Sequence, residues 1–233
     1  MHSYSLMIEG IPIPVSLQNN DTISCLLISC VIIVITCLST SRGFIARQAK
    51  AMVYKAHGKV TEVSETSAEM RAQGMLMLVT CLTVALLQYF YQSGGIGTSL
   101  DMQAVATFFG IALGYYITKL MLYFWANCTF FDIERNKTFL KALLFISSFE
   151  SVLFLPAVLL LIYFGLTIQN VTFYMVIVLI IVKIVTFYKL KTIFFTRRKA
   201  FIHFILYFCT LEGVPLLALW AVMGVSANAL TID

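Results

Sequence analysis

Charged residues are scarce in this sequence, and the motifs of common catalytic and metal sites are missing. Only 12% of the 233 residues are charged, against about 25% in soluble globular domains. The sequence contains no GxSxG, no HExxH and no glycine-rich phosphate loop. Its three histidines lie far apart, and none of its six cysteines forms a CxxC pair. We therefore predict no catalytic residue, no metal site and no cofactor, and we expect buried, unreactive cysteines.

Long hydrophobic runs take the place of these polar motifs. Hydrophobic residues make up 60% of the chain, and several runs reach the ~18 residues that cross a membrane. Each run must be helical, because lipid offers no hydrogen-bond partner to a backbone amide. We predict an all-α, polytopic membrane helix bundle with about six transmembrane helices. The predicted spans are Ile23–Thr40, Met75–Gln92, Ala104–Phe124, Leu140–Phe164, Val171–Tyr188 and Ala200–Gly224.

The spans divide the chain into five predicted segments. These are an outer N-terminal segment (1–22), the first transmembrane helix (23–40), a cytoplasmic amphipathic segment (41–74), a five-helix membrane bundle (75–225) and an outer tail (226–233). The first twenty residues have neither a basic start nor an apolar core, so we expect no secretory signal peptide. The fourth span has an alternative start, in which "NKTFLKALL" forms a turn on the membrane surface.

The basic residues orient the predicted bundle. If the N-terminus lies outside, all sixteen lysines and arginines fall in inner segments or in the inner halves of spans. The positive-inside rule therefore places both termini on the outer side. The net charge of +5 reports this topology, and we predict no nucleic-acid partner.

The inner segment Gly43–Ala56 has one broad apolar face and several basic residues. It suits a helix on the inner leaflet or a docking surface for another protein, and a solvated linker is the alternative. The expected partners are the lipid bilayer and either another membrane protein or a second copy of the chain. Further along, "TSAE" at Thr66–Glu69 resembles a capping box at a helix start.

Four ionisable residues lie well inside predicted spans: Lys119, Glu150, Lys183 and Glu212. Each costs roughly 2.5–3.5 kcal/mol to insert, which makes such residues rare. Helical side chains tilt toward the helix N-terminus, so the lysines lean toward the membrane centre and the glutamates toward the inner face. We predict at least one lysine–glutamate pair inside the bundle, with the partners left open. The alternative is that each lysine extends to the inner interface.

Both glutamate-bearing spans also carry a proline downstream, Pro156 and Pro215. A proline inside a helix removes one backbone donor and frees the carbonyl four residues earlier. We therefore predict helix kinks beside Glu150 and Glu212, with each glutamate paired or protonated. Structural packing and transport chemistry both remain open as the reason for these sites.

Two further features are weaker. Arg197, Arg198, Lys199 and His203 form a basic and polar cluster at the predicted inner interface. On a straight helix, His203 points away from Glu212, so the two do not form a catalytic pair. The small residues of "GIALGYY" in the third span indicate a face for close helix packing.

The last span adds a family resemblance. "FIHFILYFCTLEGVPLLALW" resembles the C-terminal signature, of the type LYxCTLExxP, of a domain-of-unknown-function family of polytopic inner-membrane proteins found in Bacteroidota. "ALGYYITKLMLYFWANCTFF" and "FLKALLFISSFESVLFLPAVLLL" resemble its middle spans. The resemblance implies a multi-pass protein of a bacterial inner (cytoplasmic) membrane and no assigned reaction.

Three functions follow from these patterns. The first is a structural or assembly subunit of a membrane complex, since no catalytic constellation is present. The second is a small proton-coupled transporter that uses Glu150 and Glu212. The third is a lipid-modifying membrane enzyme built around His203. We favour a protein that is not an enzyme.

Overall fold

The computed structural model describes residues 21–43, 66–93, 101–130, 133–194, 206 and 208–230. Its elements are helices throughout: α1 (Asp21–Thr40), α3 (Ser67–Gln92), α4 (Met102–Phe130), α5 (Ile133–Phe164), α6 (Ile168–Phe194), the π-helical turn η3 (Cys209–Gly213) and α8 (Val214–Leu230). The prediction of an all-α fold is thus confirmed for the described residues.

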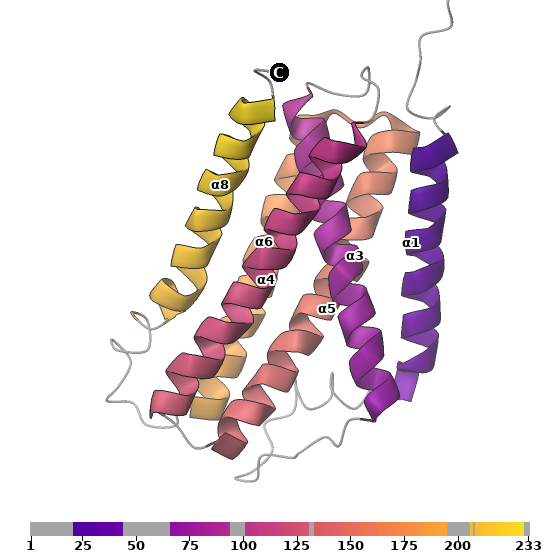
Figure 1. Cartoon of the computed structure of the whole chain (residues 1–233). Helices are drawn as coiled ribbons and strands as arrows, with labels where there is room; N and C mark the ends of the chain where they lie inside the picture. Colours follow the sequence, from indigo (N-terminus) through magenta and orange to yellow (C-terminus); the bar gives the residue numbers. More distant parts are fainter. Residues whose placement is uncertain are drawn as a thin grey trace, which may run out of the picture.

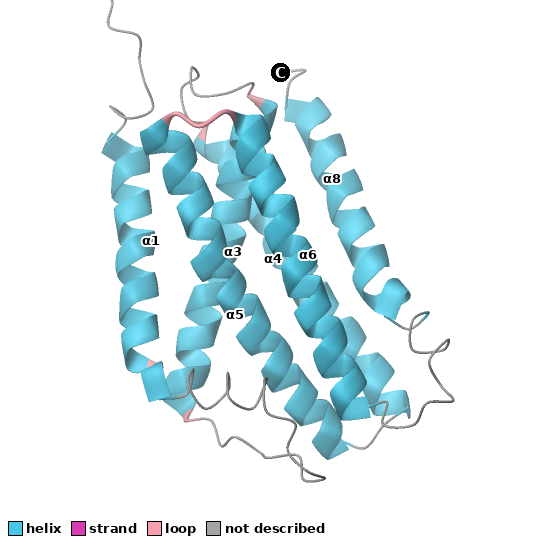
Figure 2. Cartoon of the chain, turned by 180° about the vertical axis from the view of Figure 1, so that it is seen from behind, coloured by secondary structure: helices cyan, strands magenta, loops and turns pink. Residues whose placement is uncertain are grey.

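The helices run up and down beside one another, with α3 and α5 in the middle (Figure 1). α1 packs against α3 and α5, α4 packs against α3, and α6 packs against α5. α8 packs against α4 at the edge of the bundle, and Figure 2 shows the same arrangement from behind. We call the end that holds the start of α1 and the end of α8 the upper end, as Figure 1 draws it, and the opposite end the lower end.

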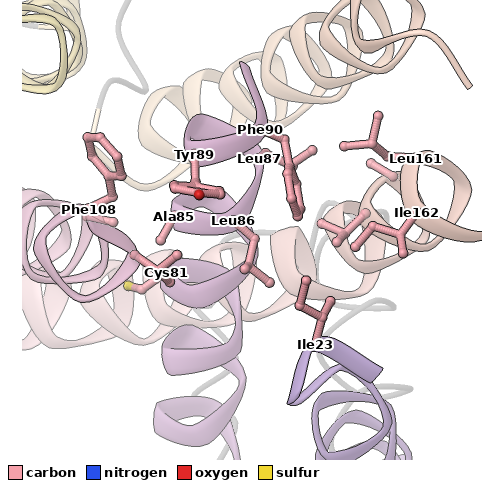
Figure 3. Close-up of a cluster of buried hydrophobic side chains, with 14 of the residues drawn as sticks. Ile23, Cys81, Ala85, Leu86, Leu87, Tyr89, Phe90, Phe108, Leu161 and Ile162 are labelled. Atoms are coloured by element: carbon pink, nitrogen blue, oxygen red, sulfur yellow. The ribbon is translucent and has the colours of Figure 1, made fainter. Parts of the chain in front are cut away.

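The main hydrophobic core lies in the upper half of the bundle. Phe90 of α3, Phe108 of α4, Leu161 of α5 and Ile23 of α1 are all nearly inaccessible there (Figure 3). These side chains pack together in one close-packed core, which holds α1, α3, α4 and α5 beside one another at the upper end.

The outward faces are as apolar as the core. Six helices are long and apolar enough to cross a membrane, and most residues of α1, α4, α6 and α8 in these stretches are not buried by protein. Large exposed side chains such as Ile184, Phe173 and Trp220 cover these faces. A surface of this kind is stable in lipid and not in water, so the six helices indicate a multi-pass membrane protein in a bilayer.

The helices extend past the predicted apolar runs at the lower end. α3 begins at Ser67, and the Thr66 backbone amide donates to the Glu69 carboxylate at 2.9 Å, which confirms the predicted capping box. α5 begins at Ile133 and is continuous through the "NKTFLKALL" stretch, so the alternative turn there is wrong. In both helices, polar residues that precede the apolar run form the first turns of the helix.

Hydroxyl side chains join the two central helices, which the sequence analysis did not predict. Thr80 donates to the carbonyl of Ser147 at 3.4 Å, and Ser148 donates to the carbonyl of Gln73 at 3.3 Å. All four of these residues are buried. Small hydroxyl residues let two membrane helices approach closely while their oxygens stay hydrogen-bonded.

A short turn connects α5 to α6 at the upper end. Gly165 has φ of 63°, a backbone conformation that few other residues adopt. The Leu166 amide donates back to the Leu160 carbonyl at 3.4 Å, so the chain after Gly165 caps the end of α5. This cap allows α6 to start only a few residues after α5 ends.

The predicted packing face in "GIALGYY" holds for Ala112, which is buried in the core, but not for the two glycines on either side of it. A Cβ added at Gly110 or Gly114 would meet nothing within 4 Å. The glycines lie on the outer side of α4, where no described helix covers them. Most of the predicted inner segment Gly43–Ala56 lies outside the described residues, as does the N-terminal segment up to residue 20.

Candidate intramembrane binding site

Three of the four predicted intramembrane charges meet at one point. The Lys119 ammonium on α4 lies 3.1 Å from Oε1 of Glu212, and the Lys183 ammonium on α6 contacts Oε2 of the same carboxylate. Glu212 therefore joins α4, α6 and the start of the last helix. Both lysines point to this carboxylate instead of the membrane interface, in contrast to the interfacial alternative.

Two tyrosines complete the hydrogen bonding of this ion cluster. Tyr123 donates its hydroxyl to Oε1 of Glu212 at 2.9 Å, and Lys183 donates to the Tyr115 hydroxyl at 3.3 Å. The Lys119 and Glu212 side chains are each 3% exposed, whereas the Lys183 side chain is 18% exposed. Burial of charges is costly unless they are paired and hydrogen-bonded, and here both conditions are met. Of the two lysine side chains, that of Lys183 is the more exposed.

A π-helical turn carries Glu212. Residues Cys209–Gly213 form η3, and α8 follows at once with Pro215 as its second residue. Proline cannot donate to the carbonyl four residues back, that of Leu211, so the regular α pattern is interrupted here. π-Turns inside helices are frequent at functional sites. Pro215 predicts a helix kink at this point, but the π-helical form of the turn does not follow from the sequence pattern.

Glu150, the fourth predicted residue, lies apart from this cluster. It is 2% exposed on α5 and accepts a hydrogen bond from the Tyr116 hydroxyl of α4. Within the described part of the chain, no basic nitrogen lies within 4.0 Å of its carboxylate. The two buried glutamates therefore differ in kind: Glu212 has two cationic partners, and Glu150 has one neutral partner.

One face of α4 supplies most of the polar partners. Tyr116, Lys119 and Tyr123 are spaced three and four residues apart, which places them on a single helical stripe. Of these three residues, only Lys119 was predicted as a site residue. The spacing of the two tyrosines, on the same stripe as Lys119, is the signal that could have found them, because a buried tyrosine hydroxyl needs a partner.

A pocket of about 730 Å³ adjoins both glutamate sites. Its walls come from α3, α4, α5, α6, η3 and α8, and nearly all its lining residues are apolar or aromatic. Its polar lining residues include Glu150, Lys183, Tyr115 and Tyr116. Ligand pockets in proteins typically measure about 300–1,000 Å³ and combine apolar walls with a few polar groups. This pocket has both properties.

The other proline does not interrupt its helix. α5 runs through Pro156 to Phe164 as one helix. The Tyr174 hydroxyl of α6 donates to the Leu153 carbonyl at 3.0 Å, close to the position where the proline removes a backbone donor. This bond ties α6 to the disturbed turn of α5.

The remaining predicted cluster, Arg197, Arg198, Lys199 and His203, lies outside the described residues. Among the residues that the structure does describe, no group of three or more histidine, cysteine or acidic side chains is placed to hold a metal ion. Described cysteines such as Cys30 and Cys81 are buried free thiols, but Cys25, Cys128 and Cys209 are exposed, contrary to expectation.

Comparison with known proteins gives a family but no activity. No curated protein and no solved structure matches the chain. One family model does match, over residues 23–223, and it is described as a domain of unknown function, DUF4271. The match includes every residue of the ion cluster, Glu150 and the pocket, and it extends over most of the sequence. The chain therefore belongs to the DUF4271 family.

Proposed function

We propose that this protein is a proton-linked carrier of a small molecule, with the pocket as its binding site and Glu150 as its proton-binding group. The supporting observation is the contrast between the two buried glutamates. Among the described residues, Glu150 lies in the pocket wall with the Tyr116 hydroxyl as its one hydrogen-bond partner, whereas Glu212 forms ion pairs with Lys119 and Lys183.

The contrast gives the two carboxylates separate roles. A buried carboxylate without a cation is costly to keep ionised, and proton binding removes that cost. Glu150 is thus suited to bind and release a proton as the pocket fills and empties. Glu212 is suited to a structural role, because two ammonium groups hold it as the anion that joins three helices.

The proposal includes an orientation. Among described residues, basic side chains such as Arg42, Arg71, Lys137 and Lys191 lie toward the lower end, and the upper end carries none. Under the positive-inside rule this supports a lower end in the cytoplasm and both termini on the outer side. The family resemblance supports the inner membrane of a bacterium as the location.

An assembly subunit remains the competing proposal. It depends on a docking surface at Gly43–Ala56, most of which lies outside the described residues, so the described geometry does not favour it. A gentle-detergent pull-down from the native membrane addresses it directly. A stoichiometric partner that is retained by Glu150→Gln would support a subunit, as would the absence of any proton movement in the assay below.

The carrier proposal is tested in liposomes that contain the purified protein and a trapped pH-sensitive dye. A small-molecule extract of the source cells is added outside, and protein-free liposomes correct for passive entry. We expect proton movement that depends on the protein and is lost in Glu150→Gln. Glutamine keeps the size of the side chain and can still accept the Tyr116 hydrogen bond, so the variant is expected to fold.

Glu69→Gln is the matched control, because it removes a carboxylate at the start of α3, outside the pocket lining, while glutamine still serves in a capping box. Equal proton movement in the wild type and in Glu150→Gln would refute the assigned role of Glu150.

A further inference from the structure

The pocket is open sideways, toward lipid. α6 lines one side with Val176, Ile180 and Ile184, which are 46%, 53% and 61% exposed, and α8 lines the other with Trp220, which is 77% exposed. In Figures 1 and 2, α8 stands at the edge of the bundle, next to α6 and α4. A molecule can therefore enter between α6 and α8 from the bilayer without crossing the water-facing ends.

The pocket meets the positive side of the ion cluster. Lys183 belongs to the lining, whereas Lys119 and Glu212 do not. The lining is otherwise apolar apart from the Glu150 site and a few hydroxyl and amide groups. A ligand in this pocket thus meets a long apolar wall and the side chain of one lysine, Lys183.

The net charge of the four ionisable groups near the pocket indicates which charge the head group of the ligand should carry. Lys119, Lys183, Glu150 and Glu212 together are neutral when all four are ionised. When Glu150 carries a proton, as the proposed function requires, the four groups carry one net positive charge. One anionic group in the pocket restores neutrality, and in a medium of low dielectric such balance strongly favours binding.

We propose that the pocket binds a single-chain amphiphile with a carboxylate head, a molecule of the fatty-acid type. Its head contacts Lys183 beside protonated Glu150, and its apolar chain lies between α6 and α8. A phosphate monoester head fits less well, because it carries about −1.5 to −2 charges and would exceed the balance. This inference rests on the proposed function for the proton on Glu150.

The test uses the two tryptophans of the chain as reporters. Trp220 lines the pocket, whereas Trp125 is 73% exposed on α4 and does not line it. In the full-length protein in nanodiscs, Trp125→Phe leaves Trp220 as the sole reporter, and Trp220→Phe leaves Trp125. The probes are undecanoate, undecanol and undecylamine, each with a bromine at the chain end that quenches nearby tryptophan.

We expect undecanoate to quench Trp220 saturably and at roughly tenfold lower concentration than the other two probes, because of the three head groups only the carboxylate forms a charge-assisted hydrogen bond with Lys183. Trp125 reports nonspecific partition and should show weak, unsaturated quenching. Lys183→Met should abolish the preference for the anion, and Lys191→Met, which alters an exposed lysine on the same helix, should preserve it.

A second pair of variants tests the pocket without altering its charges. Val176→Phe adds bulk to the lining, and Ile177→Phe adds similar bulk at the adjacent position, which is 41% exposed and outside the lining. We expect Val176→Phe to lose saturable quenching and Ile177→Phe to retain it. Both positions are exposed, so neither change should prevent folding.

Equal quenching by the three probes, a preference for the amine, or no saturable quenching would each overturn the inference. Proton uptake on undecanoate binding, followed with a pH dye, separates the two proposals. Selective binding of undecanoate without proton uptake would support the ligand class and refute the proton-linked function. Proton movement with the cell extract but no undecanoate binding would support the proton-linked function and refute the ligand class.

Discussion

The Lys119 ammonium lies 3.1 Å from Oε1 of Glu212, and both side chains are buried between α4 and the π-turn that precedes α8. This pair connects helices that are far apart in the sequence. Lys183 binds the other oxygen of the same carboxylate, so the last helix is attached to two earlier ones through a single side chain.

The first prediction concerns the free energy of unfolding. Glu212→Gln leaves two buried ammonium groups without their anion and should cost about 3–5 kcal/mol. Adding Lys119→Met removes one of these orphaned charges, so the double variant should be more stable than Glu212→Gln alone. The measurement is detergent-based unfolding followed by circular dichroism.

Lys191→Met in the Glu212→Gln background is the control, since this exposed lysine has no contact with Glu212 in the structure. If it restores as much stability as Lys119→Met does, or if neither restores any, the ion pair is not what stabilises the fold.

The second prediction concerns the Tyr123 hydroxyl, which donates to Glu212 at 2.9 Å. Tyr123→Phe should lower the free energy of unfolding by about 1.5–3 kcal/mol, the range for hydrogen bonds to charged groups. Tyr188→Phe removes a hydroxyl from a tyrosine of α6 that is 46% exposed, and it should change stability by much less. Equal losses in the two variants would contradict a special role for Tyr123.

The third prediction concerns the turn between α5 and α6. Gly165 has φ of 63°, and a side chain in this conformation costs roughly 1–2 kcal/mol. Gly165→Ala should therefore destabilise the protein by that amount, and Gly165→Asn by less, because asparagine tolerates the left-handed region better. Thermal unfolding of the three proteins in one detergent gives the order; alanine as stable as glycine would show that the turn relaxes.

The fourth prediction concerns the outer glycines of α4. No described atom lies within 4 Å of a Cβ added at Gly114, so Gly114→Ala should raise stability by up to about 1 kcal/mol through better helix propensity. A second copy of the chain packed on this face would reverse the sign, because the methyl group would separate the helices. Unfolding measurements combined with native mass spectrometry report both quantities.

Much of the architecture follows from local chemistry and could be predicted. Apolar runs specify membrane helices because lipid leaves the backbone no other partner, and the capping box at Thr66 shows in four residues. The intramembrane charges could also be identified from the sequence, because a lysine or glutamate inside an apolar run is costly to insert and therefore rare.

Pairing and pocket geometry could not be predicted, because they depend on how helices pack. Nothing near Glu212 in the sequence shows that two lysines on different helices share it, or that Glu150 meets Tyr116 instead. The pocket likewise arises because α6 packs on α5 while α8 packs on α4. Which helices pack together depends on the shapes of side chains that are far apart in the sequence, and hydrophobic periodicity does not give this information.

The position of Glu212 on the last described helix has a consequence for biogenesis. Chains fold from the N-terminus as they are synthesised, so Lys119 and Lys183 enter the membrane before their shared anion exists. Until the segment that holds Glu212 inserts, the two ammonium groups lack the carboxylate that they contact in the folded chain. The ion cluster can therefore form only late in synthesis, after α4 and α6 are already in place.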